Sequence, residues 1–102
     1  MIEITTKEEI TDETRPLIVC FTNPLTCAPC KALKPHYSNV SKVFSDDVVF
    51  AEVNVLEHMD VALDFGVSGT PTILAFVDGD VHTVESRTTI PLIEEINALV
   101  NA

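Results

Sequence analysis

The chain is short of the residues on which several classes of protein depend. It contains no tryptophan and three glycines, and six Lys and Arg residues stand against sixteen Asp and Glu, a net charge of −10. Because nucleic-acid affinity rests largely on clustered Lys and Arg, we expect no nucleic-acid partner. The longest apolar runs, residues 17–21 and 73–77, have five residues each, whereas a membrane-spanning helix needs roughly 20. We therefore expect no membrane span.

What the chain does contain suits one globular unit. Its 102 residues predict a single domain over residues 1–102, and the 46% of apolar residues exclude a disordered chain. Residues 1–7 do not combine a basic start with an apolar stretch, so we expect no secretory signal and a cytoplasmic location. The three cysteines are a poor framework for structural disulfides, because their number is odd, and two of them form Cys27-Ala28-Pro29-Cys30.

Segments with the residue pattern of strands alternate along the chain with segments whose apolar residues have helical spacing. Runs rich in β-branched residues predict strands at residues 2–4, 17–21, 48–55, 72–77 and 81–85. Helical spacing predicts helices over residues 28–44, over 57–65 and from about residue 90. A further short helix is expected after Thr6, which has capping-box spacing to Glu9. Asp78-Gly79 is a strong signal for a hairpin between the last two strands.

The resulting order, β-α-β-α-β-α-β-β-α, predicts an α/β fold with a central mixed five-stranded sheet flanked by four helices. Crossover helices join parallel strands, and the hairpin adds an antiparallel edge. The apolar stripes that would face the sheet are Leu33, Tyr37, Val40 and Phe44 in one helix and Ile93, Ile96, Leu99 and Val100 in another. Pro35 lies inside the first of these helices and predicts a kink there.

Cys27 and Cys30 fall where a buried strand gives way to the long helix. Residues three apart at a helix start lie roughly 5–6 Å from one another, which is within the range that a disulfide bridges. Free N–H groups and the positive end of the helix dipole stabilise a thiolate at such a position. We therefore predict Cys27 as the attacking thiol and the less exposed Cys30 as the resolving thiol of a dithiol–disulfide exchange.

Two other uses of this pair stay open at this point. A zinc site usually needs four ligands; the pair supplies two, and His36, His58 and His82 lack the paired spacing of a zinc motif. The second alternative is a pair of inert structural thiols. We favour redox exchange because Cys-x-x-Cys near a βαβ pattern is typical of redox sites, and we predict no metal.

Four segments together make the chain similar to the thioredoxin family over almost its whole length. Residues 26–31, Thr-Cys-Ala-Pro-Cys-Lys, resemble that family's active-site motif Trp-Cys-Gly-Pro-Cys-Lys. Pro35 matches the family's kinking proline, residues 65–72 resemble the segment with its cis-proline, and residues 76–79 match its hairpin. The resemblance implies a thioredoxin fold and a protein-disulfide reductase that carries electrons.

The resemblance also implies roles for individual residues. Cys27 and Cys30 would be the catalytic pair, and the active-site loop around them would comprise Thr26, Ala28, Pro29 and Lys31. The Thr70–Pro71 bond would be cis, with Pro71 packed opposite the cysteines. An extended substrate strand would bind at Gly69, Thr70 and Pro71. Oxidising relatives often have a His before the second cysteine, so Pro29 at that position implies a reductant.

Two departures from the family pattern bear on function. The tryptophan before the first cysteine, which in the family forms part of the rim where partners dock, is missing, and Thr26 or Leu25 takes its place. The family's buried Asp is also missing; the loop before the motif holds one extra residue, so Cys20 or Phe21 stands there. Glu52, on the neighbouring predicted strand, either replaces that Asp as the base for the deeper cysteine or reaches solvent from the strand edge. We expect Cys20 to be a buried thiol without a redox role.

These observations predict a protein-disulfide reductase without a bound cofactor, since the three glycines form no GxGxxG motif. Its partners would be disulfide-containing proteins and an electron donor of the thioredoxin-reductase type, and it would act as a monomer.

Two alternative functions stay open. The first is an interaction subunit with the same fold and weak redox activity, which the two departures favour slightly. The second is a glutaredoxin-like, glutathione-dependent reductase, which the Ala-Pro pair disfavours because that family prefers Pro-Tyr between its cysteines.

Overall fold

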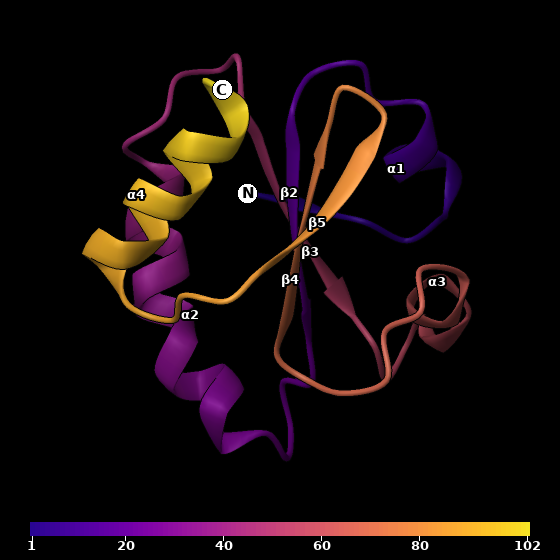
Figure 1. Cartoon of the computed structure of the whole chain (residues 1–102). Helices are drawn as coiled ribbons and strands as arrows, with labels where there is room; N and C mark the ends of the chain where they lie inside the picture. Colours follow the sequence, from indigo (N-terminus) through magenta and orange to yellow (C-terminus); the bar gives the residue numbers. More distant parts are fainter.

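Five strands form one mixed sheet at the centre of the computed structural model, which describes residues 1–102 (Figure 1). The strands are β1 (Ile2–Glu3), β2 (Leu17–Thr22), β3 (Val49–Asn54), β4 (Thr72–Val77) and β5 (Asp80–Val84). Their spatial order is β1-β3-β2-β4-β5. β3 runs parallel to β1 and β2, whereas β4 is antiparallel to β2 and β5. The predicted mixed five-stranded sheet is confirmed, with β2 in its centre.

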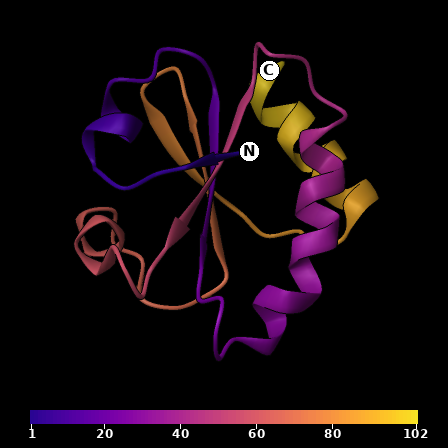
Figure 2. The ribbon, with the colours of Figure 1, turned by 180° about the vertical axis from the view of Figure 1, so that it is seen from behind.

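Four helices cover the two faces of this sheet. They are α1 (Glu8–Thr11), α2 (Ala28–Ser41), α3 (Met59–Asp64) and α4 (Thr89–Val100). Seen from both sides, α2 and α4 lie on one face and α1 and α3 on the other (Figures 1 and 2). None of the four has the length and apolar character that crossing a membrane requires.

β2 is buried on both faces, which is why its sequence is a continuous apolar run rather than an alternating one. Val19 and Phe21 point to the face that α1 and α3 cover, while Ile18 and Cys20 point to the other. We call the buried set on this other face the site-side cluster: Ile18, Cys20, Leu33, Tyr37, Val40, Phe50, Ile73, Ala75, Val77, Val84, Leu92 and Ile96. Cys20 therefore faces the long helix α2.

The hairpin between β4 and β5 turns at Asp78 and Gly79, as predicted. Both residues have positive φ, 51° and 83°. A two-residue turn of this kind needs that left-handed geometry at both positions, which Asp-Gly accepts readily.

Several predicted boundaries are wrong by a few residues. α2 ends at Ser41 instead of residue 44, although Phe44 still packs against the site-side cluster. α3 begins at Met59 instead of residue 57, because Asn54 makes a turn in which its carbonyl accepts from the N–H groups of residues 57 and 58. The Thr6 side chain does not cap α1; instead the Glu9 carboxylate accepts from the Thr6 N–H at 3.2 Å.

The buried face of α4 also differs from the predicted stripe. Leu92 and Ile96 are its buried residues, and both are 0% exposed. Ile93, Leu99 and Val100 are partly buried against the same cluster. The predicted stripe began at Ile93, the residue after Leu92, and so lay one residue round the helix from the face that is most buried.

Candidate functional site

Cys27 and Cys30 meet at the start of α2, which follows the central strand β2 through the loop of residues 23–26. They form a disulfide, and their Cα atoms lie 5.2 Å apart. Cys27 is the N-cap residue of α2, with extended backbone angles, and its Sγ accepts a hydrogen bond from the Cys30 N–H at 3.1 Å. Ala28 and Pro29 form the exposed first turn. The sequence prediction that spacing and helix start bring the two sulfurs together is confirmed.

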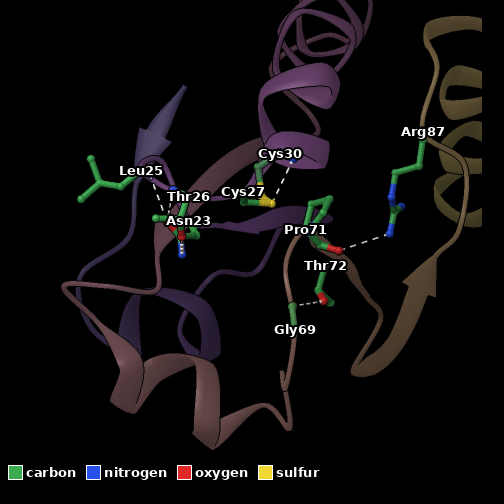
Figure 3. The surroundings of a disulfide bond; sticks show 9 residues. All are labelled: Asn23, Leu25, Thr26, Cys27, Cys30, Gly69, Pro71, Thr72 and Arg87. Atoms are coloured by element: carbon green, nitrogen blue, oxygen red, sulfur yellow. Dashed lines mark hydrogen bonds between the residues drawn. A yellow bond between two sulfur atoms is a disulfide. The ribbon is translucent and has the colours of Figure 1, made fainter.

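Pro71 lies beside this disulfide, although it belongs to a distant part of the chain, directly before β4 (Figure 3). The Thr70–Pro71 peptide bond is cis, as the resemblance implied. The Thr72 hydroxyl donates to the Gly69 carbonyl at 2.6 Å and closes a tight turn around the proline. Thr70 is half-buried and Gly69 exposed, so the backbone before Pro71 can be reached from outside the molecule.

Asn23 organises the loop before Cys27 with three hydrogen bonds of its side chain. Its Oδ1 accepts from the N–H groups of Leu25 and Thr26 at 3.0 and 3.1 Å, and its Nδ2 donates to the Thr26 hydroxyl at 2.9 Å. Leu25 is consequently displayed on the surface, 72% exposed, and points away from the disulfide (Figure 3). No tryptophan stands at this rim; Thr26, directly before Cys27, is exposed as well.

A cavity of about 140 Å³ lies behind Cys30. Its wall includes residues from β2, α2 and β3, among them Cys20, Cys30, Lys31, Lys34, Tyr37 and Glu52. Cys20, and not Phe21, therefore occupies the side of β2 that faces the second cysteine. Burial, with the negative charge of Glu52 second, raises the pKa of Cys20 to about 12, while the Arg87 charge acts in the opposite direction. At neutral pH this thiol keeps its proton.

Glu52 provides the carboxylate on the cavity wall. It lies beside Cys20 in the register of β3 on β2, is half-buried, and also lines a neighbouring hollow of about 250 Å³ together with Lys34 and Glu57. Its side chain thus stands between the space behind Cys30 and the surface. Lys31 and Lys34 are exposed at the edge of the cavity.

Tyr37 closes the inner end of the cavity and joins two strands. Its hydroxyl lies 3.0 Å from the Ile18 carbonyl and 2.8 Å from the Ala51 carbonyl. Complete burial raises the pKa of this hydroxyl well above its ordinary value. The helical spacing predicted Tyr37 as a core residue, which is confirmed, but it did not predict this polar contact.

His36 and Arg87 make further contacts that no sequence pattern predicted. The His36 ring, on α2, accepts from the Thr89 N–H at 3.1 Å and so caps α4. Arg87 reaches from the segment before α4 to the Pro71 carbonyl at 3.4 Å (Figure 3). Arg87 is one of six basic residues in an acidic chain, and no local pattern distinguished it from the other five. The structure holds no group of three or more His, Cys, Asp or Glu side chains placed to bind a metal.

Comparison with known proteins points in one direction. The family model described as Thioredoxin matches residues 3–98. The mitochondrial thioredoxin of Bos taurus is 36% identical over 75 residues, which are 74% of this chain and 45% of that protein. Thioredoxin 1 of Synechococcus elongatus is 32% identical over 77 residues, 76% of this chain and 71% of that protein. The chain thus spans less than half the length of the first relative.

A solved structure of oxidised mitochondrial thioredoxin 3 from Saccharomyces cerevisiae has the same fold. The two superpose with a TM-score of 0.83 over 97% of this chain and 95% of the yeast protein, at 24% sequence identity. The fold class expected from the sequence is confirmed.

Proposed function

The chain belongs to the thioredoxin family, and from that premise we propose that it reduces disulfide bonds of protein substrates. One observation carries this proposal: the Cys27–Cys30 disulfide lies at the start of α2, directly beside Pro71. Two cysteines at this distance can alternate between a dithiol and a disulfide.

The reaction is two successive exchanges. In the reduced protein, the Cys27 thiolate attacks one sulfur of the substrate disulfide, forms a mixed disulfide and releases the other substrate sulfur as a thiolate. The Cys30 thiolate then attacks Cys27 Sγ, forms the Cys27–Cys30 disulfide and releases the second substrate thiolate. The substrate gains two electrons and two protons, which an electron donor of the thioredoxin-reductase type must return to the pair.

Cys27 suits the role of the attacking thiol because of its place at the N-cap. Its Sγ receives the Cys30 N–H, and the positive end of α2 favours negative charge at this sulfur. Pro29, between the cysteines in place of a His, supports a reductant. The exposed loop of Thr26, Ala28 and Lys31 frames the pair, and an extended substrate segment would pair with the backbone of Thr70 and Gly69.

Glu52 is our candidate for the group that takes the proton from Cys30. The family's Asp position is filled by Cys20, whose raised pKa keeps its thiol protonated at neutral pH, so that it cannot accept a proton from Cys30. The cavity behind Cys30 has Lys31, Lys34 and Glu52 among its lining residues, and it is many times larger than the ~10–15 Å³ that one water requires. Water in this cavity would connect Cys30 with the Glu52 carboxylate, so Glu52 can act without touching the sulfur.

A pH profile tests the role of Glu52. We expect Glu52→Gln to slow resolution of the mixed disulfide at neutral pH and to change its pH dependence. Glu57→Gln is the matched control, because Glu57 lines the outer hollow but not the cavity, and it should leave the profile unaltered. An unchanged profile in Glu52→Gln would contradict the role and leave the side chain as a solvated carboxylate.

Insulin reduction driven by dithiothreitol tests the function itself. The protein should accelerate precipitation of insulin, Cys27→Ser should abolish the acceleration, and Cys30→Ser should trap the substrate as a mixed disulfide. Cys20→Ala controls for the loss of a thiol outside the pair and should remain active. Precipitation no faster than with dithiothreitol alone would leave the protein as an interaction subunit of the same fold.

We also propose a cytoplasmic, monomeric protein that binds no nucleic acid. The unpaired Cys20 supports a reducing compartment, and the charge of −10 supports the absence of a nucleic-acid partner. Microscopy of the tagged protein and sedimentation of the purified one test the first two statements.

A further inference from the structure

Arg87 is fixed between three backbone carbonyls at the edge of the disulfide site. Its Nη1 donates to the carbonyls of Val84 and Ser86 at 2.9 and 3.0 Å, and its Nη2 donates to the carbonyl of Pro71 at 3.4 Å. The side chain is half-buried and extends from the segment before α4 toward Pro71 (Figure 3). These contacts hold the guanidinium in one orientation beside the proposed substrate-binding backbone.

No carboxylate of the chain neutralises this guanidinium. The two ion pairs of the structure are Arg15 with Glu13 and His58 with Glu57. Glu95 lies close enough for the Arg87 charge to act on it, but its two oxygens accept the N–H groups of residues 85 and 86 at 3.0 and 2.9 Å. An arginine has five N–H donors, so three carbonyl contacts leave two donors available to another molecule, on a guanidinium that forms no ion pair within the chain.

The positive charge of Arg87 is unusual in a chain whose net charge is −10. The chain carries sixteen acidic and six basic residues, so a partner with acidic residues meets overall repulsion. That repulsion is screened beyond about 8 Å at physiological ionic strength. At shorter range Arg87 presents a positive charge next to Pro71, and this charge acts to lower the pKa of Cys20 against the larger effects of burial and of Glu52. A planar guanidinium with free donors matches a carboxylate.

We propose that Arg87 is a specificity-determining residue that binds a carboxylate of the substrate next to its disulfide. The inference rests on the proposed reductase function. It identifies the preferred substrates as proteins with an Asp or Glu flanking the reducible cysteine, placed along the extended segment that pairs with Thr70. The carboxylate would take the two free donors while the three carbonyls keep the guanidinium in position.

Two peptides that differ by one side chain test this preference. Each has the same intramolecular disulfide, flanked by Glu in one and by the isosteric, neutral Gln in the other. A half-exposed ion pair changes an equilibrium by about two- to fivefold, so the native protein should reduce the Glu peptide with a kcat/KM that much higher. Arg87→Gln should bring the ratio of the two peptides to about one, whereas Arg87→Lys, which keeps the charge, should retain part of it.

Lys42→Gln is the control variant, because this exposed lysine follows the far end of α2; it should keep the native ratio. A native ratio of one would overturn the role of Arg87 while leaving the reductase intact. Equal losses with both peptides in Arg87→Gln and an unchanged ratio would also overturn it and reduce Arg87 to a support for the loop. Failure to reduce either peptide would refute the reductase function, and the inference with it.

Discussion

Raising the pH should leave the Cys20 thiol protonated long after an ordinary thiol has ionised. Burial, reinforced by the charge of Glu52, raises its pKa from 9.0 to about 12. Between these two values the folded protein holds the proton more tightly than the unfolded chain, so stability is intact below pH 9 and falls as the pH rises. At 1.36 kcal/mol for each pKa unit, the unfolding free energy should drop by ~1.4 kcal/mol at about pH 10 and by ~4 kcal/mol at about pH 12.

Thiolate absorbance in the ultraviolet measures this directly in the oxidised protein, where Cys20 is the free thiol. We expect no thiolate in the folded protein up to about pH 11, and titration near the ordinary value after unfolding in urea. Cys20→Ala supplies the baseline and should lose the matching part of the alkaline destabilisation. A thiolate that forms near pH 9 in the folded protein would refute the reasoning, because it would show that burial does not hold the proton on Cys20.

Three further predictions concern the contacts around the site. Tyr37→Phe removes a buried hydroxyl between two strand carbonyls and should lower the unfolding free energy by about 1–3 kcal/mol, which urea unfolding will measure; an unchanged midpoint would contradict the contact. His36→Ala removes the acceptor for the Thr89 N–H and should cost about 1 kcal/mol, visible as a lower melting temperature, and no loss would mean that the cap is not formed in solution. Burial acts to raise the pKa of Glu95, but hydrogen bonds from two backbone N–H groups and the Arg87 charge hold it below 4.5. The Glu95 contribution should therefore be lost as the pH falls through and below this value, and Glu95→Gln should remove that part of the acid dependence; identical acid unfolding curves would argue against it.

Local patterns predicted the sheet and the cysteine pair because each depends on neighbours in sequence. The apolar run of β2 and the Asp78-Gly79 turn are visible in a few adjacent residues, and helix geometry brings Cys27 to Cys30. Helix ends were less predictable. At the start of α3, a competing turn at Asn54 has no periodic signature.

The contacts between distant segments could not be read from the sequence. Cys20 or Phe21 remained equal candidates until the side of β2 that faces α2 was known. His36 and Thr89 are 53 residues apart, and Arg87 and Pro71 are 16 apart, so only the folded chain reveals these pairs. The role of Glu52 stays a prediction, although the structure places it on the same cavity wall as Cys30.

The hydrogen bonds of Asn23 have a consequence for how this surface can diverge among related proteins. All three end within residues 23–26, so these hydrogen bonds fix the shape of the loop without a partner in the sheet or in α2. Loops of this kind accept changes in length and sequence while the elements they join stay in place. A different segment grafted between β2 and Cys27 would therefore change the exposed surface beside the disulfide, including the side chain of Leu25, while the Cys27–Cys30 pair stays in place.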